Sequence, residues 1–325
     1  MKKIIWIPLV ILIVGVVIAL AAIGAGGLKG FWVDRGGFHL ANTELGELVK
    51  VDEKYNSFKN IEINADFFDR ITIKEGDAFA VRGQNYERFG GLSVELDGDT
   101  LRVDSRHDNR WDLNIGVTNW GYKQDRAWLD VTYPKGSKLS DVRGTFSAAR
   151  VTIKDLDCET ITIKDDFGDV DLESVTADKL TADLSAGRLQ TKNISAKTVS
   201  ASSDFGKIEM DGTEADSLTL KLSAGDLSSN DTRAGNLNVK SDFGKVALDR
   251  LAFTGQCEIK CSSGDVSVGL LMNKDDLSYE LSTEAGSVYV DGQRERSSIT
   301  SRVPGSTADL RANADFGSVR LKFLS

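Results

Sequence analysis

The triplet Asp-Phe-Gly is the feature of this chain that most directly suggests chemistry. It occurs four times, beginning at Asp166, Asp204, Asp242 and Asp315. In protein kinases the aspartate of this triplet holds magnesium beside the nucleotide. A catalytic metal ligand is needed once in a chain, so four copies indicate a structural repeat instead of a nucleotide site.

The aspartates of the triplets also form a regular row of carboxylates. Carboxylates repeated along one face could cleave a glycosidic bond or bind calcium weakly. Serine takes the same place in the intervening repeats, at Ser185 and Ser223. Both side chains can stabilise a turn by hydrogen bonding. We therefore predict turn or surface residues here, and neither a catalytic nor a metal-binding residue.

The three cysteines, Cys158, Cys257 and Cys261, are predicted to be buried free thiols. Cys257 and Cys261 lie on one predicted strand, about 13 Å apart, which is too far for a disulfide. The sequence has two histidines and no Cys-x-x-Cys pair, so we expect no zinc site. It also lacks the motifs of acyl transfer and dinucleotide binding, and we expect no cofactor.

A tryptophan-rich stretch, "SRHDNRWDLNIGVTNWGYKQDRAW", spans residues 105–128. Its aromatic side chains, flanked by Arg, Asn and Asp, could grip a sugar or a peptide, or they could seal one end of the fold. The candidate ligand contacts are Trp111, Trp120, Tyr122 and Trp128.

A repeat of about 19 residues organises the second half of the chain. Glycines recur at positions 168, 187, 206, 225 and 244, and less strictly at 264, 286 and 317. Apolar residues alternate before and after each glycine, which is the pattern of half-buried strands. Two short strands and a return turn in each unit predict an all-β fold, a parallel β-solenoid of ~19-residue coils.

Phenylalanine and alanine alternate at the position before each glycine, as in Phe167, Ala186, Phe205, Ala224 and Phe243. The alternation of apolar residues predicts that these side chains point inward, with each ring covering the small residue of the next coil. The glycine is predicted to be the bend between the two strands.

The N-terminus carries a membrane-targeting signal. Lys2 and Lys3 precede an uncharged apolar run over residues 4–28, long enough to span a membrane as a helix. The charge order predicts a cytoplasmic N-terminus and an extracytoplasmic remainder on a single-pass cell-membrane anchor. A cleaved signal peptide, with a small-x-small site at Ala19-Leu20-Ala21, and a buried core helix are the alternatives.

The expected organisation is therefore an anchor over residues 1–28, a tether over 29–47, an irregular β region over 48–140 and regular solenoid repeats over 141–325. The irregular region is expected to form degenerate coils or a cap, because a solenoid end must be covered. The formal charge of -9 argues against nucleic acid as a partner.

The anchor, the repeat and the segments "IEINADFFDRITIKEGD" and "LSVELDGDTLRVDS" together resemble a bacterial family. It comprises membrane-tethered β-strand-repeat proteins labelled putative adhesins or domains of unknown function, including LiaG-like proteins of envelope-stress operons. The resemblance covers residues 45–325 and implies location and architecture, with no catalytic residues.

Three functions follow as hypotheses. The leading one is an envelope binding, adhesion or scaffolding module, related to envelope stress and recognising an envelope protein or polysaccharide. The second is an extracellular polysaccharide-acting solenoid enzyme, motivated by the aspartate row. The third is a structural spacer.

Overall fold

The structure is a computed structural model, and it describes residues 31–34, 37–40, 47–106, 113–115 and 127–324. Almost all of these residues lie in β-strands. Within these ranges no helix is long and apolar enough to cross a membrane. The predicted anchor, residues 4–28, lies outside them.

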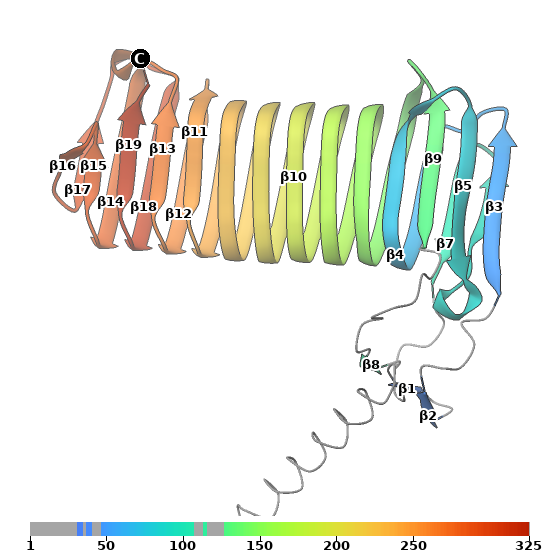
Figure 1. Cartoon of the computed structure of the whole chain (residues 1–325). Helices are drawn as coiled ribbons and strands as arrows, with labels where there is room; N and C mark the ends of the chain where they lie inside the picture. Colours follow the sequence, from blue (N-terminus) through green and yellow to red (C-terminus); the bar gives the residue numbers. More distant parts are fainter. Residues whose placement is uncertain (1–30, 35–36, 41–46, 107–112, 116–126, 325) are drawn as a thin grey trace, which may run out of the picture.

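A parallel β-solenoid forms the body of the molecule (Figure 1). Strand β10, Lys138–Phe243, winds through several coils without a break. It pairs in parallel with β4 (Asn60–Gly76) on one side, and with β11 (Val246–Phe253) and β12 (Gln256–Ser263) on the other. The predicted all-β solenoid is confirmed for the described residues.

The alternating apolar residues form the core, as the sequence predicts. Before the glycine bend, Ile161 and Ile163 are buried, and after it Val170 and Leu172 are buried. Equivalent residues stack in register from coil to coil, so each coil covers the apolar surface of its neighbours. Cys158, Cys257 and Cys261 are free and buried in this core.

The glycines mark a corner at which the backbones of neighbouring coils meet. A Cβ on Gly225 would overlap the carbonyl oxygen of Gly206, and a Cβ on Gly244 would overlap that of Gly225. No side chain fits at this position, which explains why glycine recurs with the period of the fold.

A second corner lies six residues after each glycine from Gly168 to Gly244, and six residues after Ala149 in the preceding coil. The residues at this corner have φ between 49° and 65°, in the left-handed region. Asp, Asn and Gly tolerate that conformation best, and they dominate the set. Its members are Asp155, Ser174, Asn193, Gly212, Asp231 and Arg250.

The N-terminal end combines one irregular coil with an antiparallel cap. Strands β7 (Thr100–Ser105) and β9 (Trp128–Pro134) pair in parallel with β4 and make the terminal coil. Strands β3 (Leu48–Tyr55), β5 (Phe79–Tyr86) and β6 (Ser93–Asp97) pair antiparallel outside it. A short 3-10 helix, η1 (Glu87–Phe89), follows β5. Degenerate coils and a cap, posed as alternatives by the sequence, are both present.

The C-terminal coil is inserted out of sequence order. Strands β14 (Leu277–Ala285) and β15 (Val288–Val290) form the outermost coil. Strands β18 (Ala308–Phe316) and β19 (Val319–Phe323) then return and lie between that coil and the coil of β12 and β13 (Val266–Leu270). Figure 1 shows this order of the strands. The glycines therefore stack in the spatial order 264, 317, 286.

Short elements complete both regions. Strands β16 (Gln293–Arg294) and β17 (Ser298–Ser301) pair antiparallel with β15 and β14 and cover the outermost coil, and η2 (Lys274–Asp276) precedes β14. Strands β1 (Phe31–Asp34), β2 (Gly37–Leu40) and β8 (Leu113–Ile115) form a separate three-stranded sheet.

Candidate binding edge

Three phenylalanines that the sequence places in the core, Phe167, Phe205 and Phe243, are exposed instead, and so are Phe67 and Phe316. Phe167 and Phe205 are each 69% exposed, Phe243 is 63%, Phe316 is 64% and Phe67 is 45%. The predicted inward-facing rings are therefore wrong. We call this row, with the small residues between its members, the phenylalanine edge.

These rings are exposed because the chain starts to turn before it reaches them. In the coil of Gly206, Ser203 is still buried and Ile208 is buried again. The four residues between them cross the corner, so the inward alternation is interrupted before it reaches Phe205. A buried polar residue three positions before the glycine was the sequence signal for this early turn.

The edge alternates regularly in space between large and small side chains. The pairing register places these ten residues in one column, from the N-terminal to the C-terminal end: Phe67, Ala148, Phe167, Ala186, Phe205, Ala224, Phe243, Ser263, Phe316 and Ala285. Adjacent coils are about 4.8 Å apart, so successive rings recur about every 9.6 Å.

The inserted C-terminal coil is what keeps this alternation intact. In chain order Phe243 is followed by Ser263, Ala285 and Phe316. In space Phe316 lies between Ser263 and Ala285. A ring therefore stands on every second coil as far as the last one.

The small residues leave hollows between the rings. A hollow of about 610 Å³ lies between Phe167 and the bend of β4, and Ala148, Ala186 and the buried Phe68 line it. Near the N-terminal cap, the Phe67 ring lies 6.0 Å from that of Phe89, which accounts for its lower exposure. The edge thus presents ridges and hollows with a two-coil period.

A polar row runs beside the rings, one residue earlier in each coil. Ser147 donates to Asp66 at 2.9 Å, Ser185 to Asp166 at 3.4 Å and Ser223 to Asp204 at 3.3 Å. Each serine thus bonds to the aspartate of the preceding coil. The alternation of Asp and Ser thus gives hydrogen-bonded pairs that each join two neighbouring coils, which is a structural role for the aspartate of the triplet.

Charged residues flank the other side of the bend. Arg150 and Arg188 lie 3.5 and 3.6 Å from the same oxygen of Asp169. Further along, Asp226 accepts the amide N–H of Lys245 at 2.9 Å. These contacts join neighbouring coils through groups that are partly or fully exposed to solvent.

The tryptophan-rich stretch begins and ends at this edge. Strand β7 ends at Ser105, and the chain returns at Ala127, whose N–H donates to Asp69 at 3.1 Å, in the bend that carries Phe67. Trp128 is partly buried at the start of β9, with the Arg70 guanidinium 5.7 Å from its ring centre. Trp111, Trp120 and Tyr122, the other predicted ligand contacts, lie outside the described residues.

A second hollow of about 600 Å³ lies at the return turn. Its floor is a column of alanines, and Asp178, Lys197 and Arg233 stand beside them. The alanines are Ala177, Ala196, Ala215 and Ala234. Lys197 and Asp178 pair with each other at 2.7 Å.

The cysteines of the core line neither hollow. Burial raises the pKa of Cys158 to about 11 and raises the pKa of Cys257 and Cys261 as well. A raised pKa keeps a thiol protonated and unreactive. In the described parts of the chain, no three His, Cys, Asp or Glu side chains gather to hold a metal ion.

Comparisons with known proteins concern the whole solenoid. A putative adhesin from Bacteroides fragilis NCTC 9343 shares 12% identity, with 86% of this chain and 97% of that chain covered and a TM-score of 0.43. A putative adhesin from Parabacteroides distasonis ATCC 8503 shares 11% identity, with 86% and 98% covered and a TM-score of 0.45. A putative lipid binding protein from the same strain shares 11% identity, with the same coverage and a TM-score of 0.42.

Among curated proteins no match was found. The model of the Toastrack DUF4097 family matches residues 58–321, from the N-terminal cap to the inserted coil. This chain belongs to the Toastrack DUF4097 family.

Proposed function

We propose that this protein is a membrane-tethered, extracytoplasmic binding module of the bacterial cell envelope, which adheres through the phenylalanine edge and catalyses no reaction. The observation that carries the proposal is the row of exposed rings. Single exposed apolar residues are ordinary, but a row of five aligned over ten coils is typical of an interaction surface.

The chemistry of the edge suits binding. Phenylalanine rings supply apolar area and flat faces that pack on other apolar groups or on sugar rings. The neighbouring Asp and Ser side chains supply hydrogen-bonding groups. The envelope partners we propose are a protein or a polysaccharide.

The same groups do not suit catalysis. Asp166 and Asp204 are exposed and each accepts a hydrogen bond from the serine of the next coil. General acid catalysis requires a carboxyl whose pKa is raised within reach of the substrate. The carboxyl with a raised pKa, that of Asp165, is only 2% exposed and is closed off from a surface ligand.

The membrane tether rests on Lys2, Lys3 and the apolar run over residues 4–28. The positive-inside rule supports a cytoplasmic N-terminus and an exported solenoid. An envelope-stress setting follows from the likeness to LiaG-like proteins and belongs to the same proposal.

The test is retention of the full-length protein on isolated cell-envelope material. We expect the wild type to be retained, and Phe167→Ser/Phe205→Ser/Phe243→Ser to lose at least about tenfold in affinity, since each ring buries about 100 Å² or more on contact. Leu96→Ser is the matched control, because Leu96 is an exposed apolar residue of the cap, away from the edge. Equal retention of wild type and triple variant would refute the proposal.

A further inference from the structure

The geometry points to a second copy of this chain as the partner of the phenylalanine edge, packed antiparallel about a two-fold axis. This inference rests on the proposed function, since it names what the adhesive edge binds. The axis would pass between the coils of Gly206 and Gly225, the middle of the ten-residue column.

The large-and-small pattern is self-complementary in this arrangement. The column has ten positions and begins with a ring and ends with an alanine. Reversing one copy therefore sets every ring against a small residue of the other copy. The facing pairs are Phe67 with Ala285, Ala148 with Phe316, Phe167 with Ser263, Ala186 with Phe243, and Phe205 with Ala224.

A parallel arrangement in the same register lacks this fit. It would set each ring against its own equivalent and leave hollows facing hollows. Packing at native density requires that ridges enter hollows, so the antiparallel register is favoured.

The polar row is compatible with the same register. Reversal sets Asp204 against Ser223 and Ser185 against Asp242, and the end pair, Asp66 with Glu284, is the one that sets two carboxylates together. Asp and Ser already bond to each other along the edge, so hydrogen-bond partners are also available across it. A parallel two-fold arrangement would place the two polar rows on opposite sides of the rings, where they could not bond to each other.

The exposed area is sufficient for an interface. Rings of this exposure offer about 600 Å² per copy over the five. Two copies would then bury about 1,200 Å² from the rings alone, which is the lower bound of specific protein interfaces. The small residues and the polar row add to this area.

The out-of-order C-terminal coil supports the inference independently. If the last two coils followed chain order, Ser263 would be followed by Ala285 and then Phe316. Reversal would then set Ala148 against Ala285 and Phe67 against Phe316, so a hollow would face a hollow and a ring would face a ring. The inserted coil restores the match at the end of the column.

Register-specific cross-linking tests the arrangement. Two full-length variants, Ser185→Cys and Asp242→Cys, carry different tags and are mixed in mild detergent under oxidation. The native thiols are buried and do not compete. We expect a disulfide between the two variants, and none in a mixture of Ser185→Cys with Ser223→Cys. Self-cross-linking of Ala186→Cys, a residue of the ring row, would show a parallel register and overturn the inference.

Exchanging a phenylalanine and an alanine that face each other tests the fit between the two copies. By sedimentation of the full-length protein, Phe205→Ala is expected to weaken dimerisation about 100-fold, because it removes two rings from each dimer. Ala224→Phe is expected to weaken it too, and the double variant Phe205→Ala/Ala224→Phe to restore it. Circular dichroism confirms that each variant is folded.

The outcomes separate this inference from the proposed function. A wild type that stays monomeric at high micromolar concentration, yet is retained on envelope glycan or protein through its rings, overturns the second copy as partner and keeps the binding edge. A monomer that is also not retained overturns both.

Discussion

Asp165 is a carboxylate inside the solenoid, three positions before a glycine corner. Ser203 and Ser241 occupy the same inward place in other coils, and Leu184 occupies it in the next one. Burial raises the pKa of Asp165 to about 7, although the amide of Phe167 lowers it in part. The folded chain therefore holds a proton here that the unfolded chain releases near pH 4.

This difference predicts how stability depends on pH. Between about pH 4 and pH 7 the folded state binds the extra proton, so its free energy of unfolding falls as pH rises through that window and levels off above it. The expected loss is about 2 to 4 kcal/mol. Asp165→Asn should remove this part of the decline, measured by denaturant unfolding at several pH values.

Asp166→Asn is the matched control, because Asp166 is the exposed neighbour. It should retain the wild-type decline. If Asp165→Asn and wild type show parallel stability curves from pH 4 to 7, then Asp165 is ionised in the fold and the assignment is wrong.

At the scale of single residues, the sequence predicts well which side chains form the core. It predicts poorly which side chains lie at the two corners of each coil. Inward positions such as Ile161, Val170 and Cys257 follow from alternation and are buried. Alternation holds only while a strand is straight, so the apolar pattern alone does not show that Phe205 stands on the corner; the polar Ser203 is the signal that marks the early turn. The left-handed residue at Ser174 is hidden for a similar reason, since serine does not mark such a conformation as glycine does.

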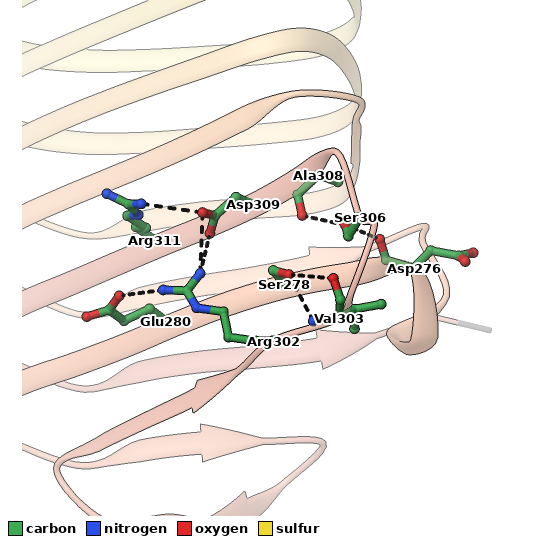
Figure 2. A network of polar contacts seen from close by, with 9 residues as sticks. All are labelled: Asp276, Ser278, Glu280, Arg302, Val303, Ser306, Ala308, Asp309 and Arg311. Carbon is green, nitrogen blue, oxygen red and sulfur yellow. Dashed lines mark hydrogen bonds and ion pairs between the residues drawn. The ribbon is translucent and has the colours of Figure 1, made fainter.

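At the scale of elements, the inserted coil depends on the segment that leads into it. The chain leaves β17 and crosses back over residues 302–307 to begin β18. Figure 2 shows Arg302 between Glu280 of β14, at 3.1 Å, and Asp309 of β18, at 3.3 Å. Nearby, the amide of Val303 donates to Ser278 at 3.1 Å. Arg302 thus joins the inserted coil to the outermost one.

Removing this arginine should loosen the inserted coil and leave the rest of the solenoid unchanged. Because the pairs are exposed, Arg302→Ala is expected to cost only about 0.5–1 kcal/mol locally. Amide hydrogens of β18 and β14 should then exchange about two- to fivefold faster, while those of β10 keep their rates. Hydrogen exchange with mass spectrometry resolves these segments.

Arg82→Ala is the control for this experiment, since Arg82 forms a similar exposed pair with Asp52, 2.9 Å away, in the N-terminal cap. It should leave β18 unaffected. Unchanged exchange in β18 of Arg302→Ala would show that strand pairing alone holds the inserted coil.

The sequence predicts the coils but not their order at the C-terminal end. Where the glycines are evenly spaced, each unit is only long enough to stack on the unit before it. The order of these coils in space therefore follows the sequence. From Gly264 onward the spacing lengthens to Gly286 and Gly317. The extra residues form β16, β17 and the crossing segment. This segment is long enough for the last two coils to stack in either order, and only the strand register shows which order is adopted.

At the scale of the whole molecule, the two ends of the rod differ. The chain enters the solenoid at β3 in the N-terminal cap, and the C-terminus lies at the far end (Figure 1). An anchor over residues 4–28 would therefore attach near the cap. In an antiparallel pair the two caps lie at opposite ends, so the pair would link two anchoring points along its length.

The last prediction concerns the side of the membrane on which the solenoid lies. The three native cysteines are buried and protonated, so intact folded protein should react poorly with a membrane-impermeant maleimide. Asp275→Cys introduces an exposed thiol just before β14, at the end of the rod far from the cap. If the solenoid is exported, this variant is labelled on spheroplasts without permeabilisation, whereas Lys3→Cys is labelled only after the membrane is opened. The reverse order of labelling would place the solenoid in the cytoplasm and contradict both the anchor orientation and an envelope binding function.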